Sequence, residues 1–549
     1  MRKLLKTISA FLIIVGTLFQ SCETLDLEEI DNPNALTEGD AQFLLNNIQL
    51  LYRASMAIAS DRSSELTRID YMFGRNYFAN YNSATMNALW GNLYSGVLPD
   101  IQAIEAVQSE SNDLRFHISV AKILQAHMMM QLVDFIGDIV PLEQATNPTE
   151  IPIPELTSDA GLTGYNQALA LLNEAVNMLQ QDPPITGVQD LYYDGDAMAW
   201  IRLANTLKLR AAITTSNYSE FNTIISGGNF ISETSQDLEF NYGTQLAPVN
   251  TQHPDYAADY TSSGAAIYQN TWLMQNMIES NDPRIRYYFY RQVNCTPGAS
   301  CDPEGNFETL RCSQLAVPAH LQGTPCEEMW CHLENGYWGR QHGNDNGTPP
   351  DNFTRTAVGV FPAGGNFDDD RFIGVNLGQS SNGAGIEPIL RASTVDFWRA
   401  EVALVAGNTS MAAMHLQNGM IKSIAKVQSS ISLDPLADIS FAPDSDAVNA
   451  FISEQMEAFN DASGEDQWNI LAEQFWVALY GGDGTTAHNF YRRTGYPSTV
   501  CPNIDPNPGN YIRTFLYPQN EVVANPSIIQ RENNDDAVFW NNQPLPTAN

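Results

Sequence analysis

Residues 165–179, which read YNQALALLNEAVNML, show which kind of fold the chain adopts. Five of the large apolar residues of this stretch are Tyr165, Leu169, Leu172, Val176 and Leu179. They recur every three or four positions, which places them on one face of an α-helix. The stretch therefore predicts an amphipathic helix that buries this face against neighbouring helices.

The same spacing is found on both sides of this helix. It recurs at Leu44, Ile48, Leu51 and Ile58, at Trp90, Tyr94, Val97, Ile101 and Ile104, through residues 116–135, and at Trp200, Leu203, Leu207 and Ala211. No motif of about 34 residues repeats literally, but the helices share their rhythm and small contact residues. Residues 37–226 are therefore predicted to form a mainly α, tetratricopeptide-like stack of helical pairs.

Residues 227–392 have a different composition. They are rich in Gly, Asn, Asp, Pro and aromatic residues and show little helical period. Long irregular stretches inside compact proteins are usually functional. This loop-rich, cysteine-rich lobe is therefore predicted to carry ligand specificity.

Helical period returns in residues 393–549. We expect helices near 395–405 and over 410–428, 446–460 and 466–480, followed by an extended tail from residue 498. Ser393 and Asp396 fit a capping box at the start of the first of these helices, and Gly407 is placed to end it.

The N-terminus has the features of an export signal. Arg2, Lys3 and Lys6 precede an apolar run over residues 8–19, and Ser21-Cys22 follow. The run is shorter than the roughly 20 residues that a membrane-spanning helix needs, and the small residue before Cys22 suits lipoprotein processing. We expect residues 1–21 to be a signal peptide and the mature domain, residues 22–549, to be anchored to a membrane by acyl chains on Cys22.

The charge excludes one class of partner. Removing residues 1–21 takes away three basic and no acidic side chains, so the formal net charge changes from −36 to −39. Only four lysines remain, Lys122, Lys208, Lys422 and Lys426. Nucleic-acid binding depends on basic residues that neutralise phosphates, so no nucleic-acid partner is expected.

Six cysteines follow Cys22, and five of them fall in the irregular lobe. They are Cys295, Cys301, Cys312, Cys326, Cys331 and Cys501. In an exported chain such an even set favours disulfides, whose connectivity the sequence leaves open. Free thiols, or a zinc site using Cys326, Cys331 and His332, are the alternatives, but the spacing matches no common zinc module.

Five short motifs follow one another along the chain. They are Asp31-Asn-Pro-Asn34, LVDFIGDIVP at 132–141, ANTLKLR at 204–210, GRQHGN at 339–344 with PPDN at 349–352 and VFPAGG at 360–365, and RRTGYP at 492–497 with Tyr517-Pro518 and Glu521. In this order, they resemble the SusD/RagB family of nutrient-binding outer-membrane lipoproteins, in its SusD-like, starch-binding-associated branch. The acidic residues after Cys22 also resemble the surface-export signal of Bacteroidetes lipoproteins.

The resemblance implies an α-helical fold with a loop-rich ligand lobe, and a location on the cell surface at the outer membrane. It also implies a partner, a SusC-like TonB-dependent transporter that the lipoprotein caps like a lid. Members bind glycans or peptides and catalyse nothing. We therefore expect an oligosaccharide-binding protein without cofactors, with oligopeptide binding as the alternative within the same uptake system.

A surface glycoside hydrolase is the alternative from another class. The sequence lacks a G-x-S-x-G elbow, an H-E-x-x-H motif and a G-x-x-x-x-G-K-[ST] loop. A catalytic carboxylate pair stays open, because 63 acidic residues offer many pairs and only their separation in space would decide.

Loop aromatics are the first candidates for ligand binding, because sugar rings stack on them while nearby polar groups bind hydroxyls. The candidate residues are Trp330, Tyr337, Trp338, Arg340, Gln341, Trp272, Tyr256 and Tyr77. Large aromatics are mostly buried, so each ring is about equally suited to core packing. A second cluster, Tyr71, Phe73, Tyr77, Phe78 and Tyr81, is expected to form another wall of the site.

Two acidic loops are weighed as cation sites. Asp368, Asp369 and Asp370 are consistent with a solvated turn or a cation site. Residues 344–347, NDNG, loosely resemble a calcium loop, but their oxygens are consecutive rather than alternating. No metal site is therefore predicted, with calcium kept as an option.

Overall fold

A computed structural model describes residues 41–142, 160–185, 187–295, 315–330, 333–346 and 351–541. Ala41–Asn549 form one compact unit. The predicted signal peptide, Cys22, Cys301, Cys312 and Cys331 lie outside the described residues.

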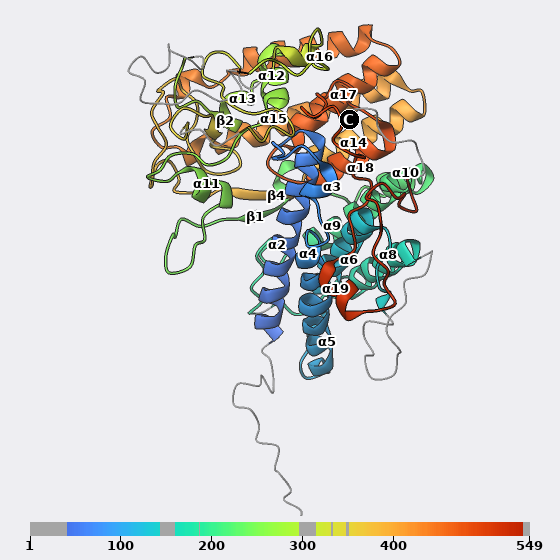
Figure 1. Ribbon diagram of the computed structural model, residues 1–549. Helices are drawn as coiled ribbons and strands as arrows, with labels where there is room; N and C mark the ends of the chain where they lie inside the picture. The colour runs from blue at the N-terminus through green and yellow to red at the C-terminus, as the bar shows by residue number, and fades with distance from the viewer. Residues whose placement is uncertain are drawn as a thin grey trace, which may run out of the picture. The chain divides into compact units, whose positions relative to one another are not determined.

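The first part of the compact unit is a stack of helices (Figure 1). They are α2 (Ala41–Thr67), α3 (Tyr77–Asn80), α4 (Asn87–Gly91), the π-helical η1 (Asn92–Val97), α5 (Leu98–Val107), α6 (Arg115–Ile136), α8 (Ala160–Leu179), α9 (Ala197–Thr214) and α10 (Tyr218–Gly227). Helix α6 packs against α2 and α8, and α8 packs against α9. Every residue of α6 after Arg115 is buried, so this helix forms the centre of the stack.

The last part of the chain is helical again. Its helices are α14 (Ala392–Val405), α15 (Thr409–Gln428), α16 (Ser445–Asp461), α17 (Glu465–Leu479), α18 (Gly484–Thr494) and the short α19 (Gln519–Ala524). The predictions for α15, α16 and α17 are confirmed to within one residue at each end. Helix α18 packs along α2, and this contact joins the first and last helical parts.

The start of α14 differs from the sequence-based expectation. Its N-cap is Arg391, which makes no side-chain cap hydrogen bond. The amide of Ala392 instead donates to Asp237, and Asp396 binds Lys422 at 2.5 Å. The capping-box prediction was wrong because the helix begins at Ala392, which places Ser393 inside the first turn, and because Asp396 binds Lys422. Gly407 does follow the helix end in a left-handed conformation.

Between these parts lies the irregular lobe. Its described residues contain α11 (Pro254–Asp259), α12 (Thr271–Glu279), α13 (Ile285–Tyr288) and four short strands, β1 (Leu238–Asn241), β2 (Phe289–Tyr290), β3 (Ala357–Val358) and β4 (Ile386–Leu390), with 3-10 turns between them. Strands β1 and β4 form one antiparallel pair, and β2 and β3 form another.

A disulfide between Cys326 and Cys501 ties the lobe to the C-terminal segment. Cys295 is disulfide-bonded as well. The disulfide interpretation is confirmed for these three cysteines, and the zinc alternative at Cys326 was wrong because its sulfur is bonded to Cys501.

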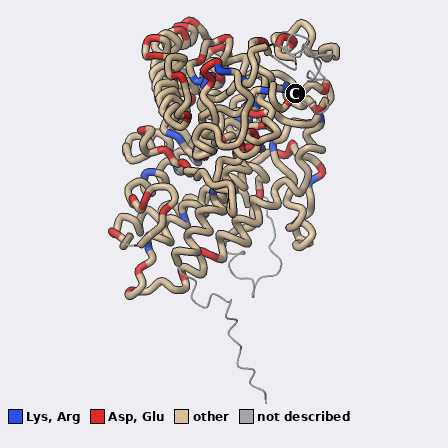
Figure 2. The backbone as a smooth tube through the Cα atoms, turned by 90° about the vertical axis from the view of Figure 1, so that its left-hand side faces the viewer, with Lys and Arg blue, Asp and Glu red and all other residues tan. Residues whose placement is uncertain are grey.

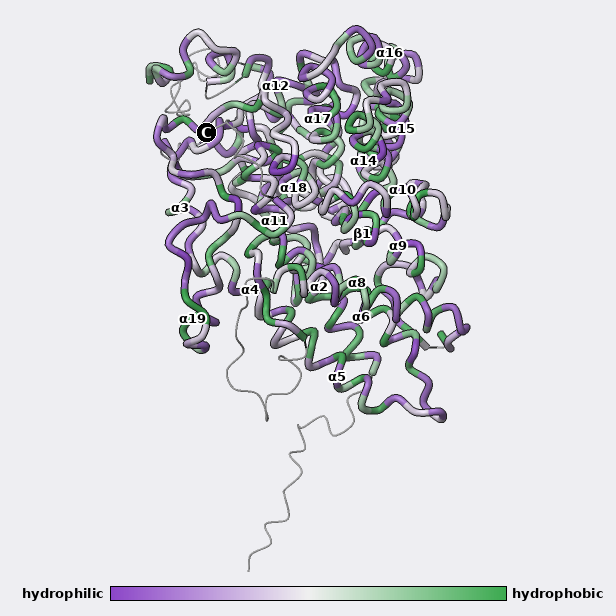
Figure 3. Tube along the Cα trace, turned by 90° about the vertical axis from the view of Figure 1, so that its right-hand side faces the viewer, coloured by the Kyte–Doolittle hydropathy of each residue, from purple (hydrophilic) through white to green (hydrophobic). Residues whose placement is uncertain are grey.

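Figure 3 shows hydrophobic stretches along α5 and α6, and the apolar residues of α6 are buried in the helical stack. Trp200, Trp398 and Trp476 are fully buried. Among the described residues, no helix is long and apolar enough to span a bilayer.

The aspartates at 368–370 are paired with arginines. Asp368 and Asp370 bind Arg286 and Arg291, and Asp369 binds Arg371 at 2.7 Å. A metal ion at this turn would have to displace these arginines, and Asp368 and Asp369 are buried rather than solvated.

Candidate functional site

A cavity of about 540 Å³ opens where several segments distant in sequence meet. Its walls come from the C-terminal part of α2 with the turn that follows, from the residues around α11 and before α12, from Arg355, Val358 and Pro362 around β3, from Glu387 on β4, and from the segment between α17 and α18. This volume falls in the range of small-molecule sites, about 300–1,000 Å³.

Helix α2 reaches the cavity because its apolar positions, Leu45, Ile48, Tyr52, Met56 and Ala59, bury one face. The opposite face is free to present polar groups, and Asp61 and Glu65, four residues apart, lie on it. The helix ends at Thr67, and Arg68 adopts a left-handed conformation that turns the chain toward the cavity. The turn then places Asp70, Tyr71 and Phe73 on the wall.

The buried carboxylate of Asp259 fixes the second wall. It accepts hydrogen bonds from the amides of Ala266 and Ile267 at 2.9 and 2.8 Å, and from Val358 at 2.9 Å. These three bonds hold the segment that carries Ile267 and Tyr268 against strand β3.

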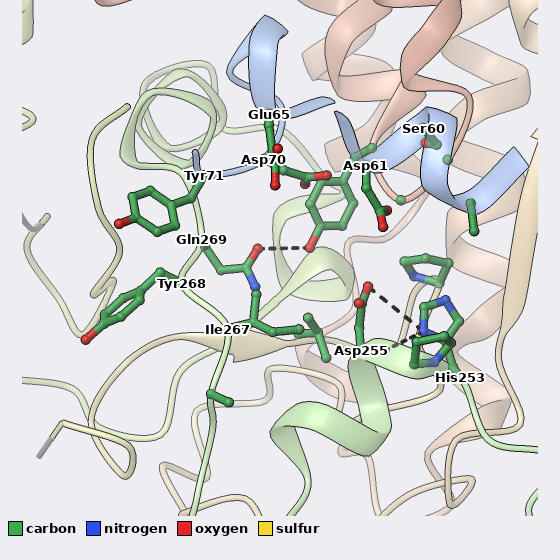
Figure 4. A pocket seen from close by; sticks show the side chains of 18 of the residues that line it. Ser60, Asp61, Glu65, Asp70, Tyr71, His253, Asp255, Ile267, Tyr268 and Gln269 are labelled. Carbon is green, nitrogen blue, oxygen red and sulfur yellow. Dashed lines mark hydrogen bonds and ion pairs between the residues drawn. The ribbon is translucent and has the colours of Figure 1, made fainter. Parts of the chain in front are cut away.

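An aromatic group forms one end of the cavity. Tyr71 and Tyr268 lie side by side there (Figure 4), edge to face with ring centroids 5.8 Å apart. The guanidinium carbons of Arg340 and Arg355 lie 4.1 and 3.8 Å from the Tyr268 ring centre, so its faces are largely occupied. Phe73 keeps 60% of its surface exposed, which makes its ring the most open aromatic surface on the wall.

Acidic side chains dominate the rest of the lining. They are Asp61, Glu65, Asp70, Asp255 and Glu387, against only Arg62 and Arg355. The carboxylates of Asp61 and Asp255 point toward one another across the cavity (Figure 4).

Burial and the nearby negative charges raise the pKa values of three of these acids. Burial, with repulsion from Asp255 and Glu65, raises the pKa of Asp61 to about 7. Burial, with repulsion from Asp61, raises the pKa of Glu387 to about 8 and that of Asp70 well above its usual value. The surface of Asp61 is open to the cavity, although protein surrounds the group on its other sides. Perturbed carboxyl groups in a cleft are typical of functional sites.

None of the eight residues proposed from sequence lines this cavity. Trp338, Trp272, Tyr256 and Tyr77 are buried, with 3% or less of their surface exposed. Trp338 and Trp272 donate to the backbone oxygens of Cys295 and Thr499, Tyr256 stacks on Tyr260, and Tyr77 bonds to His342. Their role in binding stays a prediction, and in this conformation these rings offer no free face.

The remaining candidates lie in the lobe. Tyr337 is buried and Trp330 is half-buried. Gln341 donates to the backbone oxygen of Cys326 at 2.8 Å. Arg340, through its contact with Tyr268, is the one candidate that supports the cavity wall directly.

The second aromatic cluster divides between two roles. Tyr71 and Phe73 line the cavity, as expected of a wall, while Tyr77 and Tyr81 are in the core. Phe78 is 46% exposed but lies outside the cavity. The acids on α2, α11 and β4 were missed, and the only sequence signal for any of them was the four-residue spacing of Asp61 and Glu65.

Metal sites receive no support from the geometry of the described residues. Among them, no three His, Cys, Asp or Glu side chains are arranged to hold a metal ion. In the suggested calcium loop, Arg75 binds Asp345 at 2.6 Å and Asn346 at 2.7 Å. A calcium ion at this loop would have to displace Arg75, and calcium binding stays an untested option.

Two family profiles match the sequence. The profile described as "Starch-binding associating with outer membrane" matches residues 33–320, which is more than half of the chain. The chain belongs to the SusD/RagB family. The profile described as "Susd and RagB outer membrane lipoprotein" matches residues 381–534 of the same SusD/RagB protein. It is therefore an outer-membrane nutrient-binding protein, as its motifs predicted. No curated relative matches the sequence.

Solved structures share the SusD/RagB fold. A susd/ragb family protein from Bacteroides thetaiotaomicron is 16% identical, with a TM-score of 0.62 over 92% of this chain and 99% of its own. A SusD-like protein from Bacteroidetes AC2a matches equally well, covering 92% and 100%. A chitin-binding protein, also 16% identical, has a TM-score of 0.60 over 92% and 100%. The predicted mainly α, tetratricopeptide-like fold is thereby confirmed.

Proposed function

We propose that this SusD/RagB protein is a lipid-anchored lipoprotein on the cell surface that captures an oligosaccharide and delivers it to a SusC-like TonB-dependent transporter. In this proposal the protein binds its ligand without catalysing a reaction. The lipid anchor is supported by the signal-like segment that ends at Cys22. The transporter partner is supported by membership of the family alone.

The cavity carries the proposal of ligand capture. It combines an exposed ring, Phe73, with polar groups that can bind hydroxyls, which is the pairing that a sugar requires. The family description names starch, and one structural relative is a chitin-binding protein. Both names support a glycan in preference to a peptide.

Titration calorimetry tests the proposal. The purified chain is titrated with neutral polysaccharides, anionic polysaccharides and mixed oligopeptides, and products are analysed after each run. We expect saturable heat with neutral or cationic glycans, weak heat with anionic ones because of the acidic lining, and no product. Saturable heat with peptides alone would replace glycan by peptide as the ligand.

A glycoside hydrolase is the second candidate, and the facing carboxylates of Asp61 and Asp255 are the observation that favours it. The raised pKa of Asp61 would suit a general acid. Release of reducing ends that disappears in Asp61→Asn would establish this activity and overturn the binding-only proposal.

A further inference from the structure

The cavity holds more negative than positive charge, and its two arginines are already paired with other carboxylates than Asp61. Arg62 binds Glu65 at 3.0 Å. Arg355 binds Asp351, which does not line the cavity. Asp61 thus has no cation partner among the described residues.

The negative charges of Glu387, Asp255 and Asp70 are not balanced by a paired cation within the described part of the chain either. Glu387 accepts a hydrogen bond from Tyr242 at 3.0 Å, and Tyr242 in turn accepts from Arg53. Asp255 lies 3.9 Å from His253, whose pKa is lowered by burial, so this imidazole is neutral near pH 7. Asp70, on the turn after α2, has no ion pair among the described residues either.

A second observation concerns Gln269. This residue lines the cavity and is 4% exposed. Its side-chain oxygen accepts a hydrogen bond from Tyr480 at 3.1 Å (Figure 4), while its Nε2 has no acceptor among the described residues. A buried amide without a partner costs stability, so this donor indicates a ligand that brings an acceptor oxygen.

The three features define one ligand chemistry. The carboxylates suit a cation, the amide of Gln269 suits a hydroxyl oxygen, and the open ring of Phe73 suits an apolar C–H face. A sugar residue with a free amino group carries all three within one ring.

We propose that the cavity binds a glycan residue bearing a primary ammonium, held between Asp61 and Asp255. This inference rests on the proposed function and narrows its ligand class. A charged hydrogen bond from an ammonium to a carboxylate is roughly twice as strong as a neutral one.

The raised carboxyl pKa values give the binding a characteristic pH dependence. A bound ammonium favours the ionised carboxylate, so binding releases a proton from any acid that is protonated in the free protein. With the pKa of Asp61 at about 7, affinity rises as the pH increases toward that value. Between about pH 5 and about pH 6, where the sugar amine is still an ammonium, the ionised fraction of Asp61, and hence the affinity, increases about tenfold.

Three β-1,4-linked tetrasaccharides that differ only at carbon 2 test the inference. The full chain is titrated at both pH values with the tetramers of glucose, glucosamine and N-acetylglucosamine. We expect the glucosamine tetramer to bind at least about tenfold more tightly at the higher pH than the glucose tetramer. Its affinity alone should increase with pH.

Matched variants locate the effect. Asp61→Asn and Asp255→Asn should each remove the preference for glucosamine and flatten its pH dependence. Asp461 is an exposed acid on α16 that does not line the cavity, so Asp461→Asn should leave both unchanged.

Two results would overturn the inference, and they separate it from the proposed function. Equal affinities for the glucose and glucosamine tetramers would refute the ammonium site while leaving glycan capture intact. A glucosamine preference that persists in both Asn variants would also refute it, because the cation would then bind elsewhere. Failure of every glycan in the wider panel would refute the proposed function itself.

Discussion

Replacing Phe73 by Ala tests the candidate site most directly. The ring lines the cavity and is 60% exposed, so its removal takes away a surface for ligand while disturbing little packing. We expect the thermal midpoint of unfolding to stay nearly unchanged and the affinity for the captured glycan to fall.

The exposed ring area sets the magnitude. A phenylalanine presents about 150–250 Å² in total, so the open 60% corresponds to roughly 120 Å². A stacked sugar covers one face, or roughly 60 Å², which is worth about 1.5 kcal/mol at about 25 cal/mol per Å². Because about 1.4 kcal/mol corresponds to a tenfold change, the dissociation constant should rise about tenfold.

Isothermal titration calorimetry with a glycan that binds the unaltered chain measures this change. Phe78→Ala is the matched control, because Phe78 is also exposed, lies five positions away and does not line the cavity. A change of less than about twofold in Phe73→Ala, or an equal loss in Phe78→Ala, would refute the assignment of the aromatic wall.

Three further predictions concern stability. Replacing both Cys326 and Cys501 by Ser should lower the free energy of unfolding by about 3–5 kcal/mol in chemical denaturation, because the bond spans 175 residues; a loss below about 1 kcal/mol would contradict this. Trp338→Ala should lower the free energy of unfolding by about 3–5 kcal/mol without changing glycan affinity, since the ring is 1% exposed. Weakened binding at unchanged stability would instead show that Trp338 contacts the ligand. Burial raises the pKa of Glu387 to about 8 and of Asp237 to about 7, so the folded state holds these protons more tightly than the unfolded state. The free energy of unfolding should therefore fall as the pH rises from about 5 to about 8, and Glu387→Gln should reduce the slope of denaturation midpoint against pH.

The helices were predictable because their pattern is local. The spacing of Trp468, Leu471, Phe475 and Leu479 fixes α17 without reference to any other segment. The capping of α14 was not predictable, because the acceptor for its first amide, Asp237, is 155 residues away.

The candidate site was predictable only in part. Tyr71 and Phe73 could be named as a wall from their clustering in the sequence. The role of Trp338 could not be predicted, because the exposure of a ring depends on the surrounding fold. In the structure this ring is buried and donates a hydrogen bond to the backbone oxygen of Cys295. Asp61 and Asp255 come together only because α2 and α11 meet in space.

The few basic residues of the chain are partly used inside the core. The chain has 27 basic residues against 63 acidic ones, and acidic positions outnumber basic ones in Figure 2. Several arginines are nevertheless fully buried, among them Arg68, Arg210 and Arg284. Arg284 holds Asp282 inside the core, so part of the small positive charge is used to stabilise buried acids.

The hydrogen bonds of Asp259 have a kinetic consequence. They use only the protein's own amides, so the wall that carries Tyr268 is held in place before a ligand arrives. Association then needs no slow closing step, and ligands of different affinity differ mainly in how quickly they dissociate. For the proposed sugar ligand, weaker binding in the cavity should therefore appear as faster dissociation rather than as slower association.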